Sequence, residues 1–281
     1  MTLSVAWVRT AGESQELVIA TDSRLRFGCA WDACQKIFMM PRGDCAVCFA
    51  GDTQYAYPLM NAIDSTIRSY PKSMNRQQEL SVLKGHILRV MNRMLESISN
   101  LPIGQEKLDD PKAFFLFGGF CWRKKEFLLW TLHYDSKIRL FTFRPTSRWA
   151  GVDGHKKIAF VGDYIDDAKG RLVDKLRAKN SLDQGGFDME PLEVLCDMLG
   201  DGNEYPQIGG APQVAKIYQR CASVAFPVMW GGENEQSPHF LGRPYLPGEG
   251  VYPPVLELST MTFRSCRPTG DGGFAFVEVG S

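Results

Sequence analysis

The sequence has no excess of charge of either sign. Its 32 lysines and arginines are balanced by 32 aspartates and glutamates, so the formal net charge is zero at neutral pH. A neutral chain creates no overall field that would steer it onto nucleic acid or an anionic membrane surface. We therefore expect no nucleic-acid partner and no membrane partner, and the sequence gives no reason to expect a local basic patch.

Long apolar segments are also missing. The longest apolar stretch, 113–122, is interrupted by two glycines and is much shorter than the roughly 20 residues that span a bilayer. Residues 1–5 lack the basic and apolar segments of a signal peptide. The eight cysteines are spread through a large chain, for which reduced thiols in the cytosol are the default. These observations predict a cytoplasmic protein.

Metal and cofactor motifs are absent as well. The four histidines have no metal-ligand spacing, and neither a Walker A loop nor a dinucleotide fingerprint is present. Cys45 and Cys48 form a CxxC, but they lie in an apolar run that is typical of a strand. Residues three apart on a strand point to opposite faces, which predicts two buried thiols instead of a metal site. We expect no cofactor, and any dependence on ATP would come from a partner.

Hydrophobic periodicity predicts an α+β fold. Short strands are expected at 3–8, 17–20, 36–40, 45–50, 113–122, 127–134, 138–143, 157–161, 214–218 and 223–228. Helices are expected from about 52 to 67, with a late start or a kink at Pro58, and then over 80–98, 164–178 and 191–199. This order of strands and helix pairs predicts four layers, αββα, with two sheets packed face to face and helices outside both.

The C-terminal segment has a different composition. Residues 227–281 contain seven prolines and nine glycines in 55 positions, too many turn formers for regular structure along the whole length. Apolar runs at 255–258 and 274–277 indicate that the segment is not a free tail. We expect one domain over 1–225 and an extension over 226–281 that packs on the body or on a neighbouring subunit.

Chemistry is concentrated near the N-terminus. Methionine before a small residue is normally removed, which would leave Thr2 with a free α-amine of ordinary pKa about 7.7–8.0. A neutral amine beside the hydroxyl can take its proton and create a nucleophile without histidine. Taken alone, Thr2 is more simply a residue that happens to follow the initiator, and if Met1 is retained this mechanism fails.

Three fragments behind Thr2 carry a family resemblance. Residues 18–24, VIATDSR, resemble the proteasome-subunit strand that ends in Ala-Asp-Ser-Arg. Residues 35–38, QKIF, resemble the following Lys-Lys-Ile segment, and 48–51, CFAG, resemble the Ala-Gly before the first helix. In this order the fragments resemble the proteasome β-subunit-like N-terminal-nucleophile (Ntn) hydrolases, a family with bacterial homologues of the proteasome. The resemblance implies the four-layer Ntn sandwich.

The resemblance implies a role for each matching position. Thr2 Oγ1 would be the nucleophile, and its α-amine the general base and later the acid. Lys36 would favour the deprotonated hydroxyl, Asp22 would hold Lys36, and the N–H of Gly51 at a helix start would stabilise the oxyanion. Taken singly, Asp22 and Gly51 are equally well read as turn residues and Lys36 as a solvated charge. Residues near the substrate strand and its side-chain pocket would be Thr21, Arg26 and Phe49.

Later positions depart from the family pattern. Asp163 replaces the serine of a Gly-Ser-Gly segment, and Ile208 replaces the serine of a Ser-Gly-Gly segment. Tyr205, with Glu204 beside it, occupies a position that is usually aspartate. In the family these groups orient the N-terminus, so their replacement bears on activity. A carboxylate at Asp163 could still bind the α-amine and would then raise its pKa.

The sequence therefore predicts a threonine-type peptidase that cleaves peptide bonds, with a peptide or protein as substrate. The alternatives are a non-catalytic proteasome-like subunit and an Ntn amidase for a small amide. The resemblance also implies a homo-oligomer and allows an ATP-dependent unfoldase as partner.

Overall fold

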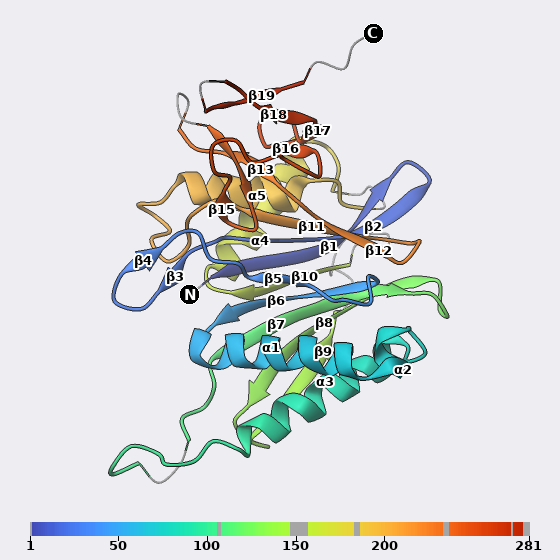
Figure 1. Cartoon of the computed structure of the whole chain (residues 1–281), viewed down its shortest axis with the longest axis vertical. Coiled ribbons are helices and arrows are strands. Elements are labelled where there is room, and N and C mark those ends of the chain that lie inside the picture. Colours follow the sequence, from blue (N-terminus) through green and yellow to red (C-terminus); the bar gives the residue numbers. More distant parts are fainter. Residues whose placement is uncertain are drawn as a thin grey trace.

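The computed structural model describes residues 2–105, 108–146, 157–182, 186–232, 236–270 and 272–277. Two five-stranded antiparallel sheets form the centre of the molecule (Figure 1). The first has the order β10-β1-β2-β11-β12, from Ile158–Gly162, Leu3–Ala11, Ser14–Thr21, Gln213–Tyr218 and Ala222–Phe226. The second has the order β5-β6-β7-β8-β9, from Ile37–Met39, Cys45–Gly51, Ala113–Cys121, Glu126–Asp135 and Leu140–Pro145.

Helices cover the outer face of each sheet. Helices α1 (Thr53–Ser69) and α3 (Leu80–Leu95) share a buried core with the second sheet, and the one-turn helix α2 (Pro71–Met74) joins them. Helices α4 (Ile165–Ala178) and α5 (Glu190–Gly200) share another with the first sheet. A third core fills the space between the sheets. The predicted four-layer α+β fold is confirmed.

Strand β6 shows why the apolar runs are unbroken. Cys45, Val47 and Phe49 face the helices, whereas Ala46 and Cys48 face the other sheet. Both faces are buried, so no polar alternation marks this strand in the sequence. The prediction that Cys45 and Cys48 point to opposite faces is confirmed. Within the described ranges no group of three or more His, Cys, Asp or Glu side chains could hold a metal.

Helix α1 begins where the sequence indicates. The Asp52 carboxylate caps it by accepting from the backbone N–H of Gln54 at 2.9 Å. The expectation of a late start at Pro58 was wrong, because the helix starts at Thr53 and continues through the proline. The sequence reading missed α2 and a hairpin of β3 (Leu25–Arg26) and β4 (Ala30–Trp31). No helix in the described part of the chain is long and apolar enough to cross a membrane.

The C-terminal segment forms small sheets on the body (Figure 1). Five strands form the sheet β15-β14-β13-β16-β17, from Arg243–Pro244, Ser237–Phe240, Val228–Trp230, Val255–Glu257 and Thr262–Arg264. Strands β18 (Cys266–Pro268) and β19 (Phe274–Phe276) form a separate ribbon. Each of these strands has two to four residues, in a segment rich in proline and glycine. The segment is thus more regular than its composition indicated. Val228 and Leu256 join the core beneath α4 and α5, so the segment packs on the first sheet.

Candidate active site

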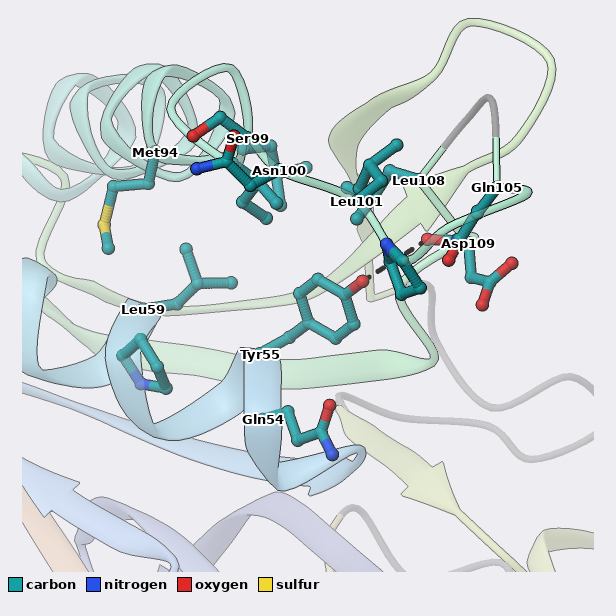
Figure 2. Close-up of a pocket in the computed structure, with 14 residues that line it drawn as sticks. Gln54, Tyr55, Leu59, Met94, Ser99, Asn100, Leu101, Gln105, Leu108 and Asp109 are labelled. Atoms are coloured by element: carbon teal, nitrogen blue, oxygen red, sulfur yellow. Dashed lines mark hydrogen bonds between the residues drawn. The ribbon is translucent and has the colours of Figure 1, made fainter.

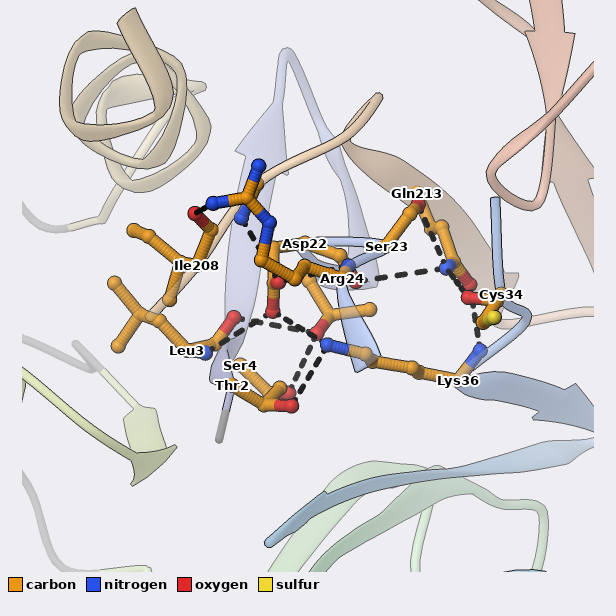
Figure 3. A network of polar contacts seen from close by, with 12 residues as sticks. Thr2, Leu3, Ser4, Asp22, Ser23, Arg24, Cys34, Lys36, Ile208 and Gln213 are labelled. Carbon is orange, nitrogen blue, oxygen red and sulfur yellow. Dashed lines mark hydrogen bonds and ion pairs between the residues drawn. The ribbon is translucent and has the colours of Figure 1, made fainter. Parts of the chain in front are cut away.

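Strand pairing brings Thr2 beside Asp22. Strands β1 and β2 are antiparallel neighbours in which Ser4 pairs with Thr21, so the start of β1 meets the end of β2. Lys36 directly precedes β5, the first strand of the opposite sheet. The three side chains therefore meet where the ends of the two sheets approach each other (Figure 3).

The Lys36 ammonium links the other two residues. Its Nζ donates to Thr2 Oγ1 at 2.7 Å and to Asp22 Oδ1 at 2.8 Å. All three residues have a relative exposure of 0%. A buried ammonium this close to a hydroxyl favours the deprotonated form of that hydroxyl by charge proximity. The predicted trio of residues 2, 22 and 36 is thus one contiguous buried cluster.

Asp22 is surrounded by donors. Besides Lys36, its carboxylate accepts from the backbone N–H groups of Leu3 at 3.2 Å, Arg24 at 3.0 Å and Gly209 at 3.2 Å. Burial raises the pKa of the Asp22 carboxyl, while the charge of Lys36 and the N–H groups of Arg24 and Gly209 counteract part of that rise. A buried ion pair is tolerated when its remaining lone pairs are satisfied in this way.

Asp163 holds Thr2 from the other side. Its Oδ2 accepts from Thr2 N at 2.8 Å, and its own N–H donates to the Thr2 carbonyl at 2.7 Å. Here Thr2 N is the amide of a peptide bond to Met1, which itself lies outside the described residues, so it stands in for the α-amine that removal of Met1 would leave. The carboxylate predicted to reach this nitrogen does so.

Two glycines shape the backbone around Thr2. Gly162 has φ of +110°, and a Cβ there would collide with the Thr2 carbonyl oxygen. Gly51 has φ of +96°, and a Cβ there would collide with the Lys112 carbonyl oxygen. Only glycine fits both the dihedral angle and the space at these positions. Gly51 leads directly into the Asp52 cap, so it lies at the N-terminal, positive end of the α1 dipole.

A cavity of about 460 Å³ opens beside this cluster. Its walls come from β3, the β6–α1 junction, the start of β7 and the β10–α4 junction. The lining residues are Arg26, Gly51, Asp52, Thr53, Lys112, Phe114, Gly162 and Asp163. Thr2 is buried directly behind Gly162 and Asp163.

The three predicted substrate-binding residues are placed differently. Arg26 lines the cavity, and its Nη1 donates to the Pro206 carbonyl at 3.2 Å. Thr21 is buried, with its Oγ1 at 2.7 Å from Ser4 Oγ. Phe49 does not line this cavity, because its buried ring packs against Tyr57 at 5.0 Å between centroids. Phe49 points to the helical layer, as the strand alternation of β6 requires.

The remaining departures from the family pattern are structural residues here. Ile208 is buried in the core beneath α4 and α5. The Tyr205 ring packs edge-on against Tyr164 at 5.0 Å, and its hydroxyl donates to Glu204 at 2.9 Å. The segment still supports the cluster through Gly209, whose N–H reaches Asp22.

Gln213 is a residue that sequence reasoning missed. Its Oε1 accepts from the N–H of Lys36 at 2.9 Å, and its Nε2 donates to the Cys34 carbonyl at 2.7 Å. It thereby ties the lysine-bearing segment to β11, although 177 positions separate Lys36 from Gln213. No local pattern in the sequence marks this contact, because it depends on the pairing of β11 with β2.

The nearby thiol is not a rival nucleophile. Cys48 Sγ lies 3.3 Å from Ser4 Oγ, between the two sheets. Burial raises the pKa of Cys48 to about 11, so the thiol stays protonated at neutral pH.

A second cavity, of about 490 Å³, lies between α1, α3 and the segment that follows α3 (Figure 2). Apolar side chains such as Leu59, Met94 and Leu108 dominate its lining. The Tyr55 hydroxyl there donates to the Asp109 carbonyl at 3.5 Å. Among the described residues that line this cavity, no ionisable groups converge as they do around Thr2, so the N-terminal cluster is the stronger candidate for chemistry.

Comparisons with known proteins support the fold. No protein-family model matches the chain, and no curated protein matches it. Among solved structures, a Gly-1 mutant of Anbu from Hyphomicrobium sp. strain MC1 matches with a TM-score of 0.53 and 13% identity. The match covers 80% of this chain and 85% of that one. The neighbour has an Ntn-hydrolase-like fold, compatible with the α+β sandwich of this chain.

Proposed function

We propose that this chain is a proteasome-like, threonine-type Ntn hydrolase that cleaves peptide bonds once Met1 has been removed. The observation that carries the proposal is the 2.7 Å contact from Lys36 Nζ to Thr2 Oγ1, completed by the buried Asp22. A lone threonine hydroxyl is a weak nucleophile, and an adjacent ammonium with a neighbouring amine is a known way to activate it.

The proposed reaction has two steps. In the first, Thr2 Oγ1 attacks the peptide carbonyl, the α-amine takes the hydroxyl proton, and the same proton passes to the departing amine. The product of this step is an ester on Thr2. In the second, water attacks the ester and the α-amine accepts a proton from the water. The amine passes this proton to the departing Thr2 Oγ1, which releases the carboxylic acid and restores the hydroxyl.

Each residue around Thr2 would have a separate role in this reaction. Lys36 would stabilise the deprotonating oxygen, and Asp22 would hold Lys36 in place. The N–H of Gly51, at the positive end of α1, would face the developing oxyanion. Asp163 would orient the α-amine through the contact now made to Thr2 N. The 460 Å³ cavity beside these groups would receive the substrate as an extended strand. We further propose a homo-oligomer, with an ATP-dependent unfoldase as possible partner.

A non-catalytic, proteasome-like subunit is the second candidate. It is favoured by the replacement of two serine positions by Asp163 and Ile208 and by the full burial of Thr2 in the chain that carries Met1. An amidase for a small amide is a third, since a cavity of this volume also suits a small ligand.

Covalent labelling tests the proposal. The purified protein is treated with a β-lactone or an epoxyketone, and the modified residue is mapped by mass spectrometry together with the N-terminus. We expect loss of Met1 and a single label on Thr2, absent in Thr2→Ala. Peptide hydrolysis that persists in Thr2→Ala would show that the nucleophile is elsewhere. Retention of Met1 without labelling would favour the non-catalytic candidate, and turnover of small amides alone would favour the amidase.

A further inference from the structure

Three arginines distant in sequence meet at the end of the sandwich opposite to Thr2. Arg76 follows α2, Arg123 lies in the β7–β8 turn and Arg220 in the β11–β12 turn. Figure 1 shows α2 and β12 at one end of the molecule and the N-terminus at the other. Strand β7 runs the whole way, from Ala113 beside Gly51 to Cys121 before the arginine turn. Nine strand residues span about 30 Å.

These arginines line a cavity of about 460 Å³. The other lining residues are Asn75, Gln77, Trp122 and Cys221. No carboxylate is among them, and no ion pair is formed by the three arginines in the part of the chain that the structure describes. The sequence alone gives no reason to expect this basic patch, because folding gathers arginines that lie far apart in the chain.

The cavity is built from interlocking contacts. Arg76 Nη1 donates to the Cys221 carbonyl at 3.3 Å, and Trp122 Nε1 donates to the Arg76 carbonyl at 3.3 Å. Arg76 also adopts a left-handed φ of +66°, a conformation that costs energy for a residue with a Cβ. Arg123 lies over the Trp122 ring at 5.2 Å from its centroid. Hydrogen bonds to Cys221 and from Trp122 therefore hold Arg76 in place beside the Trp122 ring.

A fourth arginine lies close to the cavity, but an ion pair balances its charge. Arg42 is 3% exposed and pairs with Asp44, and its Nη2 donates to the Gln78 carbonyl at 2.9 Å. Its Nη1 is buried and has no hydrogen-bond acceptor among the described residues. Asp44 balances this charge. Among the described residues, no carboxylate lines the cavity or pairs with the three lining arginines.

We propose that this cavity binds a diphosphate anion, either inorganic or carried on a nucleoside. Guanidinium groups match phosphate oxygens in bidentate geometry, and three of them converge where no carboxylate competes. The amides of Asn75 and Gln77 supply further donors, and the Trp122 indole offers a face for a nucleobase. The site lies at the far end of the sandwich from Thr2, so it is independent of the proposed hydrolase activity.

Titration calorimetry of the full chain with pyrophosphate and with ADP tests the proposal. We expect saturable binding that weakens as salt is raised, because exposed charges are screened. Arg123→Ala and Arg220→Ala should each raise the dissociation constant about tenfold, the loss of one charge-assisted contact. Arg93→Ala, which removes an exposed arginine on α3, and Thr2→Ala are the controls and should leave binding unchanged.

The two ligands separate the possible sources of the diphosphate. Tighter binding of ADP than of pyrophosphate would assign the site to a nucleoside diphosphate, and equal binding would assign it to the inorganic anion. The proposal is overturned if neither anion binds saturably, or if Arg93→Ala weakens binding as much as the two cavity variants. Since Arg123 and Arg220 are exposed, we expect both variants to have the wild-type melting temperature. Measuring an unchanged melting temperature would exclude misfolding as a cause of lost binding.

Discussion

In the proposed mechanism, the chemistry depends on a single lysine with two partners. Lys36 is fully buried, and its charge is tolerated because a carboxylate and a hydroxyl lie within hydrogen-bond distance of it. Removing one of the two charges should destabilise the fold more than removing both. A single buried charge without a partner costs far more free energy than the absence of the whole pair.

Lys36→Met tests this asymmetry. The variant leaves Asp22 buried without its cation, and we expect the free energy of unfolding to fall by about 3–5 kcal/mol. The double variant Lys36→Met, Asp22→Asn should recover at least half of that loss. Arg68→Met is the control, because its pair with Asp64 is exposed and an exposed ion pair contributes little to stability. Urea denaturation measures all four proteins, and a double variant no more stable than Lys36→Met would contradict the pairing argument.

Asp163→Asn tests the role of the carboxylate at the Thr2 nitrogen. A carboxylate beside an amine favours the ammonium and raises the pKa of the amine, so the neutral base is available only at higher pH. Replacing it by an amide should move the acidic limb of the pH profile of kcat/KM to lower pH. Asp166→Asn, an exposed position in the first turn of α4, should leave the profile in place. A profile that moves upward, or not at all, in Asp163→Asn would remove Asp163 from the mechanism.

At the scale of elements, the β10–α4 junction sets the position of Thr2. Gly162 ends β10 directly against the Thr2 carbonyl, and Tyr164 continues with a left-handed φ of +56°. Two positive φ angles, at 162 and 164 on either side of Asp163, turn the chain sharply, so that Asp163 reaches both the carbonyl and the nitrogen of Thr2.

Gly162→Ala should therefore disturb the site as well as the fold. The added methyl group must displace Thr2 and occupy a dihedral angle unfavourable to alanine, and we expect a loss of more than about 1 kcal/mol in stability. Gly170→Ala is the matched control. A Cβ there meets open space within α4, and alanine is the better helix former by about 1 kcal/mol. Thermal unfolding of both variants tests this, and we expect a lower melting temperature for Gly162→Ala than for Gly170→Ala. Equal melting temperatures would contradict the close approach of residues 2 and 162.

Most elements could be predicted from the sequence, and so could the Thr2, Asp22 and Lys36 cluster. Strands with both faces buried and helices with one apolar face leave strong patterns, and Asp52 marks the start of α1. Phe49 lies on the helical side of β6, away from the cavity, because membership in a motif does not say which face a strand residue takes. Gln213 and the arginine cavity could not be found, because each depends on contacts between segments that lie far apart in the sequence.

At the scale of the whole molecule, three histidines link stability to pH. Burial lowers the pKa of His86, His133 and His239 below the ordinary value of 6.5. The unfolded chain therefore takes up these protons first as the pH falls through 6.5. The stabilisation is complete above that pH and is lost as the pH drops toward the folded pKa values.

His239→Gln measures how much of this pH dependence of stability comes from the histidine in the C-terminal sheet. Its ring nitrogen Nδ1 lies 2.9 Å from the Ser237 carbonyl on β14. We expect the variant to lose less stability than the wild type between pH 7.5 and pH 5.5, with unfolding by urea followed at both values. Subtracting the loss in free energy of unfolding of the variant from that of the wild type cancels the contributions of other titrating groups, including Asp22. An identical loss in both proteins would mean that His239 titrates alike in the folded and unfolded chains.

The β1–β2 hairpin also limits how the N-terminal region can change in length. Residues 4 to 11 pair one to one with 21 to 14, so removing a facing pair near the turn would leave Thr2 beside Asp22. Inserting a single amino acid within β1 would instead invert every side chain before it and turn the threonine hydroxyl away from its lysine. Natural variation in this region should therefore accumulate at Gly12–Glu13, or arrive as compensated pairs, while the spacing from residue 2 to the first strand pair stays constant.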